Sequence, residues 1–205
     1  MNITERSFEN SANASEFSKT YFSQISHLFN QIDTDQIQNF ITELSKARKR
    51  GSSIFILGNG GSASTASHFA NDLLLGAQKT HQPFRAISLS DNSAVLTCIG
   101  NDQGFENIFQ SQLEGLLKKE DVVIAITASG NSININKALS WAKGHGAITL
   151  SMTGFDGGET ARLTHFNIHV PTPVGDYGIV ESIHATLEHL ICNYMLMSMT
   201  RENLQ

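Results

Sequence analysis

The chain has 205 residues, of which 40% are hydrophobic and 16% are charged, a balance that allows one buried core and argues against intrinsic disorder. Its net charge of -5 argues against a broad nucleic-acid-binding or anionic-membrane surface, because both need an excess of basic residues. Only two cysteines are present, the N-terminus is polar, and no apolar run reaches the roughly 20 residues that span a bilayer. We therefore expect a cytoplasmic protein without membrane or nucleic-acid partners.

Apolar residues recur at helical spacing from about residue 14 and predict two helices before residue 50. Asp33-Thr34-Asp35 provides a cap ahead of the second helix, and Gly51 ends it. We expect residues 1–205 to form a single domain, in which residues 1–50 are N-terminal helices and residues 51–205 are an α/β core.

In this core, strands alternate with helices. The predicted strands are Ser53–Leu57, Arg85–Leu89, Val122–Thr127, Ala147–Met152 and Phe166–Val170. The predicted helices are Ala63–Leu75, Ser93–Ile99, Phe105–Lys119, Ser132–His145, a short piece near Glu159–Leu163, and a long final helix over Tyr177–Thr200. Four strands carry consecutive apolar residues, as expected under helices on both faces, whereas Phe166–Val170 alternates and is assigned to a sheet edge. The order predicts a doubly wound α/β fold, whose ligands bind at the carboxyl ends of the strands.

Two of these strands end in similar loops. Gly58-Asn59-Gly60-Gly61-Ser62 follows the first strand, and Thr127-Ala128-Ser129-Gly130-Asn131-Ser132 follows the third. Each loop directs backbone N–H groups and hydroxyls towards the N-terminus of the next helix, an arrangement that binds anions such as phosphate. A single loop of this kind can be a simple glycine turn, but two loops favour a phosphorylated ligand.

Acidic and histidine side chains recur on two predicted helices. His68 and Asp72 are spaced i, i+4, which suits a shared metal ion or proton transfer, although an ordinary surface pair is the competing interpretation. Glu181, His184, Glu188 and His189 lie on the final helix, where we interpret Glu188 as part of a solvated face. Asn101 and Asp102 form either a turn with a helix cap or contacts to sugar hydroxyls.

Together these residues resemble the sugar isomerase (SIS) domain family, and within it the phosphoheptose isomerases. The resemblance extends over nearly the whole chain, through the segments GNGGSASTASHFANDL, IGNDQGFENIF, ITASGNS, MTGFDGG and VESIHATLEH. It implies a three-layer sandwich with a five-stranded parallel sheet flanked by helices, a homotetramer with active sites between subunits, and bound zinc. The implied reaction converts sedoheptulose 7-phosphate into D-glycero-D-manno-heptose 7-phosphate, a step towards the heptose of lipopolysaccharide.

The resemblance also assigns roles to residues. Substrate contacts fall on Asn59, Gly60, Gly61, Asn101, Asp102, Thr127, Ala128, Ser129, Ser132 and Glu181. Metal ligands fall on His68, Asp72, Glu181 and His189, and the acid/base pair on Asp72 and His189. These residue types suit ketose–aldose conversion, which needs a general acid, a general base and stabilisation of an enediolate oxygen.

Several residues depart from the family pattern. Asp72 stands where the best-known enzymes have Glu, and Glu181 stands where they have Gln. Gly178 and Ile179 replace an acidic and a basic residue, and an expected Arg is missing from Leu73–Gly76. The departures bear on sugar specificity more than on the fold, so an isomerase for a different phosphosugar is one alternative. Another is a non-catalytic relative that binds the replication initiator DnaA or senses sugar phosphates.

The implied metal ligands also pose a geometric problem. Glu181 and His189 are eight residues apart, about 12 Å along an ideal helix. Three arrangements would resolve it: Glu181 precedes the regular helix, the site combines two subunits, or His184 binds instead.

Overall fold

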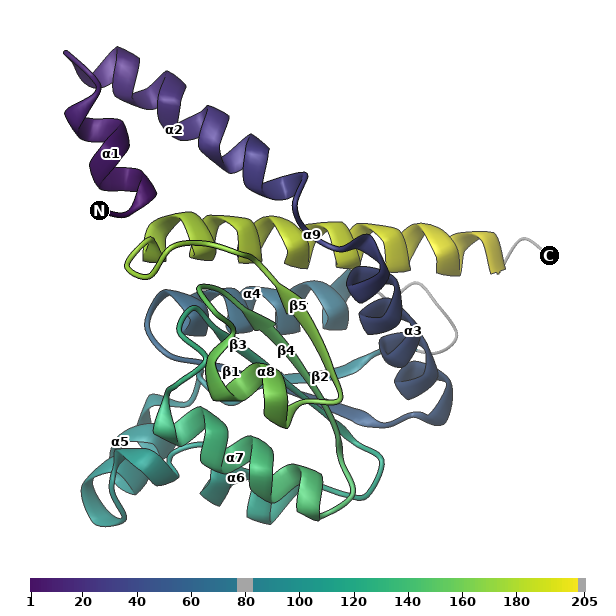
Figure 1. Cartoon of the computed structure of the whole chain (residues 1–205). Helices are drawn as coiled ribbons and strands as arrows, with labels where there is room; N and C mark the ends of the chain where they lie inside the picture. The colour runs from purple at the N-terminus through teal and green to yellow at the C-terminus, as the bar shows by residue number, and fades with distance from the viewer. Residues whose placement is uncertain (77–82, 203–205) are drawn as a thin grey trace.

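The computed structural model describes residues 1–76 and 83–202, and one parallel sheet lies between two layers of helices (Figure 1). The N-terminal helices are α1 (Ile3–Glu9), α2 (Ala14–Phe29) and α3 (Thr34–Arg50). The core then contains β1 (Ser53–Gly58), α4 (Gly61–Gly76), β2 (Arg85–Ser88), α5 (Ser93–Asp102), the 3-10 helix η2 (Phe105–Asn107), α6 (Gln110–Leu116), β3 (Val122–Thr127), α7 (Ile133–Gly144), β4 (Ile148–Thr153), α8 (Gly158–Leu163), β5 (Phe166–His169) and α9 (Tyr177–Glu202). The predicted fold class is confirmed.

The five strands are parallel and lie in the order β2-β1-β3-β4-β5. β1 and β3 are neighbours in the sheet but not in sequence, so the direction of winding reverses between them. Gly58 at the end of β1 pairs with Ile126 near the end of β3. The two glycine- and serine-containing loops therefore leave the sheet side by side, at its topological switch point.

The two edge strands differ in how well the sequence predicts them. β5 lies at an edge, as its alternating pattern predicts. The expectation that Arg85–Leu89 is covered on both faces is wrong, because β2 forms the opposite edge and alternates between exposed and buried residues. Ile87 on this strand is exposed, whereas every residue of the central strand β3 is buried.

Two apolar layers flank the sheet. On one face, Ile54, Ile56 and Ile124 pack under residues from α3, α4 and α9. On the other, Phe55 and Leu57 pack under α6 and α7. Figure 1 shows the same division, with α4 and α9 above the sheet and α5, α6 and α7 below it. The layer with α4 and α9 matters for the functional site. α4 begins just after the carboxyl end of β1, and α9 begins after the connection that follows β5.

The first two helices form an arm along one end of α9 (Figure 1). α1 is an addition to the predicted elements: Asn2 caps it in a reciprocal capping box with Glu5. Asp176, just before α9, accepts a 2.7 Å hydrogen bond from the Ile3 backbone nitrogen and so ties the arm to the core. The arm leaves large apolar side chains exposed, with Phe8 72% and Phe22 66% accessible.

Some predicted helix boundaries are confirmed and one predicted helix is wrong. Asp33 caps α3, and Gly51 ends it with a φ of +71°. The predicted helix over Phe105–Lys119 is instead η2 followed by α6, and it ends at Leu116. The first turn tightens because Asn107 donates its backbone N–H to Gly104 and its side-chain amide to Gln103. Among the residues described, no helix is both long and apolar enough to cross a membrane.

Candidate functional site

The first loop, residues 58–62, joins β1 to α4. Gly58 has no room for a side chain, because a Cβ there would lie 2.6 Å from the backbone oxygen of Ser62. Asn59 and Asn134 of α7 exchange two amide hydrogen bonds, each 2.9 Å long. The first loop is thus fastened to the helix that follows the second loop, which fixes the spacing between the two.

The second loop, residues 127–132, joins β3 to α7. The Gly130 nitrogen donates to Thr127 Oγ1 over 3.2 Å, and the Gly130 carbonyl accepts from the backbone nitrogen and the hydroxyl of Thr160, each over 2.9 Å. Gly130 has a φ of +66°, and a Cβ there would overlap the carbonyl oxygen of Gly157. Ser132 precedes α7 without using its hydroxyl as a cap. The loop is therefore rigid, and a hydroxyl at its end is left for a ligand.

The two loops and the start of α9 surround a cavity of about 100 Å³. Six predicted substrate-binding residues line it: Asn59, Thr127, Ala128, Ser129, Ser132 and Glu181. Their amide and hydroxyl groups gather at the N-terminal ends of α4 and α7, where an anion is stabilised. Gly60 and Gly61 lie in the first loop, and the Glu181 carboxylate is so close to Gly61 that a Cβ there would collide with it.

Asn101 and Asp102 take a different position. They form the last residues of α5, where both side chains are exposed and the Asn101 amide donates to Asp102 Oδ1 over 2.7 Å. Neither residue lines the cavity between the loops. Their predicted contact with the sugar therefore stays a prediction.

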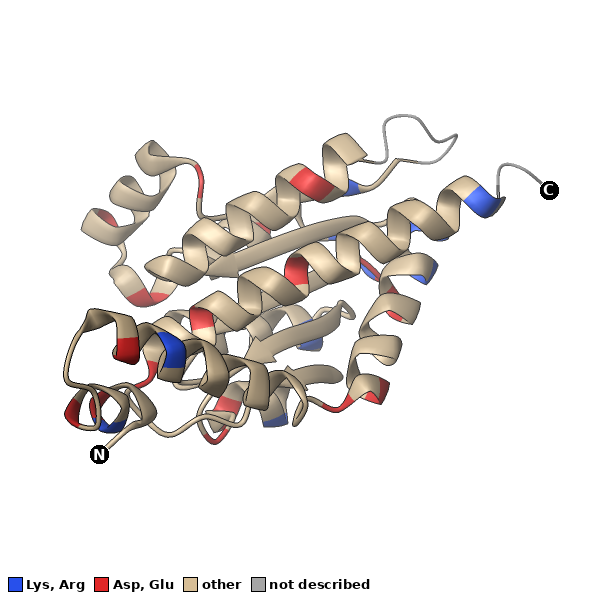
Figure 2. Cartoon of the chain, turned by 90° about the horizontal axis from the view of Figure 1, so that it is seen from above, with Lys and Arg blue, Asp and Glu red and all other residues tan. Residues whose placement is uncertain are grey.

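A second group of functional side chains lies between α4 and α9, which run side by side (Figures 1 and 2). It consists of His68 and Asp72 from α4 and of Glu188 and His189 from α9, and we call it the α4–α9 cluster. One ligand atom from each residue lies within 4.8 Å of the others. Asp72 Oδ1 is 3.6 Å from His68 Nε2, and Asp72 Oδ2 is 3.5 Å from His189 Nδ1.

Glu188 belongs to this cluster although its sequence pattern indicated a solvated face, so that interpretation is wrong. Its side chain is fully buried, because α9 turns this face towards α4. Burial raises the pKa of Glu188, and His189 and His68 oppose that rise. Its Oε2 atom lies 3.0 Å from His189 Nδ1 and 3.8 Å from His68 Nδ1, but without hydrogen-bond geometry to either.

The donor set of the α4–α9 cluster fits a zinc ion. Zinc in proteins takes imidazole nitrogens and carboxylate oxygens at about 2.0–2.2 Å, which puts tetrahedral ligands about 3.3 Å apart. One ligand atom from each of the four residues lies within 4.8 Å of the others, so small side-chain rotations would bring them to that separation. Glu188 Oε2 is a buried acceptor with no hydrogen-bond partner among the described residues, as expected for an atom that a cation would satisfy.

Glu181 and His184, the other two residues that the sequence analysis singled out on α9, lie elsewhere. Glu181 is inside the regular helix, which begins at Tyr177, so an irregular helix start does not bring it to His189. His184 is fully buried, and burial lowers its pKa to about 4. Within the part of the chain that the structure describes, neither residue joins the α4–α9 cluster. The structure thus unites three of the four residues that the resemblance implies as metal ligands.

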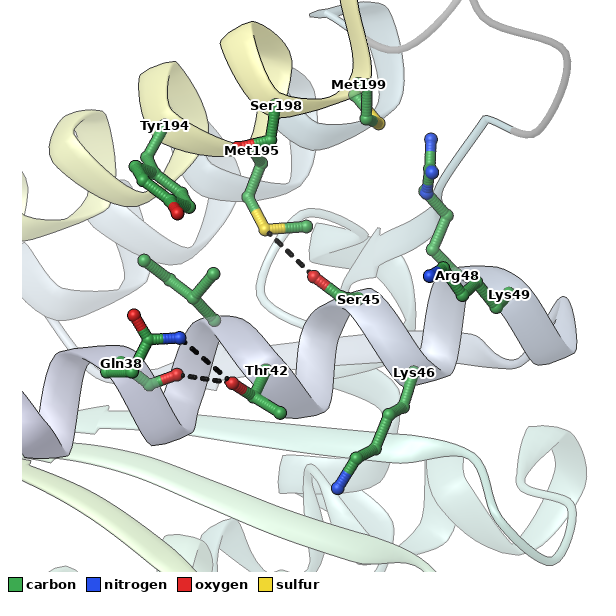
Figure 3. A pocket seen from close by; sticks show the side chains of 11 residues that line it. Gln38, Thr42, Ser45, Lys46, Arg48, Lys49, Tyr194, Met195, Ser198 and Met199 are labelled. Carbon is green, nitrogen blue, oxygen red and sulfur yellow. Dashed lines mark hydrogen bonds between the residues drawn. The ribbon is translucent and has the colours of Figure 1, made fainter. Parts of the chain in front are cut away.

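A larger hollow of about 330 Å³ lies between α3 and α9, away from both loops. Figure 3 shows Lys46 and Lys49 on α3 and Tyr194 and Met195 on α9 around it. Ser45 donates to the sulfur of Met195 over 3.8 Å across this hollow. None of the predicted site residues lines it, so its size does not mark the functional site.

Comparisons with known proteins confirm the family that the sequence resembles. A family model described as a SIS domain matches residues 20–154. A phosphoheptose isomerase of Aquifex aeolicus is 38% identical over 164 residues, which cover 80% of this chain and 85% of the relative. One of Nitratidesulfovibrio vulgaris is 37% identical over 165 residues, covering 79% of this chain and 77% of the relative. The solved structure of phosphoheptose isomerase GmhA from Neisseria gonorrhoeae matches with a TM-score of 0.81 at 26% identity, covering 89% of this chain and 98% of that one.

Proposed function

This chain belongs to the SIS domain family, and we propose that it is an aldose–ketose isomerase that converts sedoheptulose 7-phosphate into D-glycero-D-manno-heptose 7-phosphate. One observation carries the proposal: α9 lines the cavity between the two loops with Glu181 and contributes Glu188 and His189 to the α4–α9 cluster. Glu181 and Glu188 are seven positions apart in the sequence, about 10 Å along the helix. A linear sugar with a phosphate at one end and a carbonyl at the other needs two such sites.

The cavity between the loops holds the phosphate in this proposal. The hydroxyls of Ser129 and Ser132 and the N–H groups of the second loop donate hydrogen bonds to it, while Asn59 and Gly61 contact the sugar chain. Glu181 accepts hydrogen bonds from sugar hydroxyls, because a carboxylate repels the phosphate itself. Anchoring the phosphate fixes which carbon atoms reach the α4–α9 cluster.

Proton transfer takes place at the other end. The reaction moves one proton from C1 to C2 of the ketose and one from the C1 hydroxyl to the C2 oxygen, through an enediol. Asp72 takes the carbon-bound proton and returns it to the neighbouring carbon, while His189 exchanges the oxygen-bound proton. Their side chains are 29% and 50% exposed, so both are accessible to a substrate. Zinc held by His68, Asp72 and His189 would polarise the carbonyl oxygen when bound.

We further propose that the chain acts in the cytoplasm as a homotetramer whose active sites lie between subunits. Phe8 and Phe22 on the N-terminal arm support assembly. Their aromatic side chains are exposed, and exposed apolar surface of this kind is typical of protein–protein contacts. The partly open cluster supports a contribution from a neighbouring subunit to the site.

The direct test is turnover of sedoheptulose 7-phosphate by the purified protein with added zinc, with the aldose product measured by chromatography. We expect turnover that falls by about 10²–10⁴-fold in His189→Ala, the usual contribution of a general acid or base. Ser132→Ala should mainly raise KM. Turnover no higher than that of His189→Ala would refute the proposal. Turnover of another ketose phosphate with a higher kcat/KM would keep the reaction class and replace the substrate.

A further inference from the structure

The wall that α9 contributes to the cavity between the two loops consists of two residues. Tyr177 is the first residue of the helix, and Glu181 follows one turn later on the same face. Tyr177 is not among the residues to which the family resemblance assigns a role. An ionised carboxylate accepts hydrogen bonds but donates none, whereas a phenol hydroxyl can donate one. Among the described residues that line this cavity, Tyr177 is therefore the side chain with which α9 can donate to an anion.

The hydroxyl of Tyr177 is available for such a contact. The side chain is 53% exposed, and its hydroxyl has no hydrogen-bond partner among the described residues. An exposed hydroxyl can bond to water, so its exposure alone does not indicate a ligand. What distinguishes Tyr177 is that the structure around the second loop holds its ring in place.

Phe155, in the connection between β4 and α8, holds the ring of Tyr177. The two ring centroids are 5.0 Å apart and the planes are inclined by 82°, an edge-to-face contact that is attractive between aromatic rings. Phe155 itself is buried and packs with Ala128 of the second loop and Val180 of α9. One aromatic ring thus links the second loop to the first turn of α9, where Tyr177 lies.

The backbone of Phe155 is strained. Its φ of +50° lies in the left-handed region, which residues with a Cβ adopt at a cost in free energy. Its N–H donates a 3.1 Å hydrogen bond to Thr172 Oγ1, which holds the connection in this conformation. Strain of this kind is concentrated at binding sites, where the surrounding structure maintains it. A glycine would adopt the same backbone without strain, so the phenyl ring has to provide what glycine cannot, namely the contact with Tyr177 and the packing around it.

We infer that Tyr177 is a substrate-binding residue whose hydroxyl donates a hydrogen bond to the phosphate of the ligand in the cavity between the loops, and that Phe155 is the positioning residue that orients it. This role rests on the proposed function only in taking phosphate as the occupant of the cavity. The two loops donate to the phosphate from the carboxyl ends of β1 and β3, and Tyr177 donates from α9. Glu181, which repels phosphate, is left to the sugar hydroxyls.

The test measures phosphate binding and needs no turnover. Tyr177→Phe removes the hydroxyl but keeps the ring and its contact with Phe155, so the fold should be unaffected. Tyr194→Phe is the matched control, because Tyr194 lies on the same helix, is 52% exposed and lines the hollow between α3 and α9 instead. For each full-length protein, the dissociation constant of inorganic phosphate is measured by titration calorimetry at constant ionic strength.

We expect Tyr177→Phe to raise this dissociation constant by about tenfold, the usual effect of removing one hydrogen bond to a charged group, and Tyr194→Phe to leave it within about twofold. Equal affinity of Tyr177→Phe and the unaltered chain would overturn the role of Tyr177, and so would an equal loss in both variants.

Ser132→Ala separates the role of Tyr177 from the proposed phosphate site itself. If Ser132→Ala loses affinity and Tyr177→Phe does not, the role of Tyr177 is wrong and the phosphate site stands. If neither variant loses affinity, or if the unaltered chain binds no phosphate, both are wrong. An absence of isomerase turnover bears on neither result.

A second measurement tests whether Phe155 acts through Tyr177. Phe155→Leu keeps an apolar side chain against Ala128 and Val180 but removes the aromatic edge, and we expect it to raise the phosphate dissociation constant by about threefold. Added to Tyr177→Phe it should have no further effect, since the hydroxyl that it orients is absent. A general loosening of the fold would instead weaken phosphate binding equally with and without the hydroxyl. Additive losses, or unchanged affinity in Phe155→Leu, would therefore overturn the positioning role.

Discussion

The second loop offers a quantitative test of the geometry that holds the phosphate end of the site. Gly130 and Gly51 both have a left-handed backbone, with φ of +66° and +71°. They differ in their surroundings: a Cβ on Gly130 would overlap the Gly157 carbonyl, whereas a Cβ on Gly51 would meet nothing within 4 Å. Substituting alanine at each position therefore separates backbone strain from steric overlap.

The expected magnitudes follow from these surroundings. Gly51→Ala carries only the strain of a left-handed alanine, about 1–2 kcal/mol. Gly130→Ala carries the same strain and also displaces the neighbouring loop, which weakens the two hydrogen bonds from Thr160 to the Gly130 carbonyl, each about 1 kcal/mol. We expect a loss of unfolding free energy of about 3–4 kcal/mol for Gly130→Ala. In a chain of this length each kcal/mol lowers the thermal midpoint by about 2–4 °C.

The assay is urea and thermal unfolding of both variants at one fixed protein concentration, because assembly makes the midpoint depend on concentration. KM for the phosphosugar is measured in parallel, and we expect it to rise in Gly130→Ala and to stay unchanged in Gly51→Ala. If Gly130→Ala is no less stable than Gly51→Ala, the packing of the second loop against Gly157 does not have the role that we give it.

Three further predictions concern the rest of the site and the assembly. Asn134→Ala should lower kcat/KM by about tenfold, because Asn59 loses both of its hydrogen bonds, and a double-mutant cycle with Asn59→Ala should show strong coupling. Burial lowers the pKa of His184 to about 4, so below pH 6.5 the imidazole takes up a proton in the unfolded state before it does so in the folded state. Between pH 6.5 and pH 4 the unaltered chain should therefore lose about 3 kcal/mol more unfolding free energy than His184→Leu. Equal pH profiles of the two proteins would contradict this. Phe22→Glu should reduce the molar mass measured by light scattering, whereas Val174→Glu, an exposed control outside the arm, should not.

The sheet and its loops were predictable because their signals are local. The run Val122–Ile126 is apolar along its whole length, as expected for a central strand that is covered on both faces. The two loops follow such runs directly, so the parallel-sheet rule was enough to expect them at one edge. β2 shows the limit of the same reasoning: Ile87 is apolar but exposed, because nothing in the described part of this chain covers that side of the edge strand.

Glu188 was harder to predict for a physical reason. Its sequence neighbours fix its position on the helix surface, but only the packing of α9 on α4 decides whether that surface meets water or another helix. The residues that bring the two helices together are 120 positions apart in the sequence. Gly61 and Gly76 on α4 have the same spacing as Glu181 and Leu196, which they contact on α9. Small residues at matching spacing allow two helices to approach closely, and a carboxylate midway along such a contact is buried against whatever the other helix presents. Here the other helix presents His68 and Asp72, so the residue that the sequence pattern assigned to solvent lies among the candidate metal ligands.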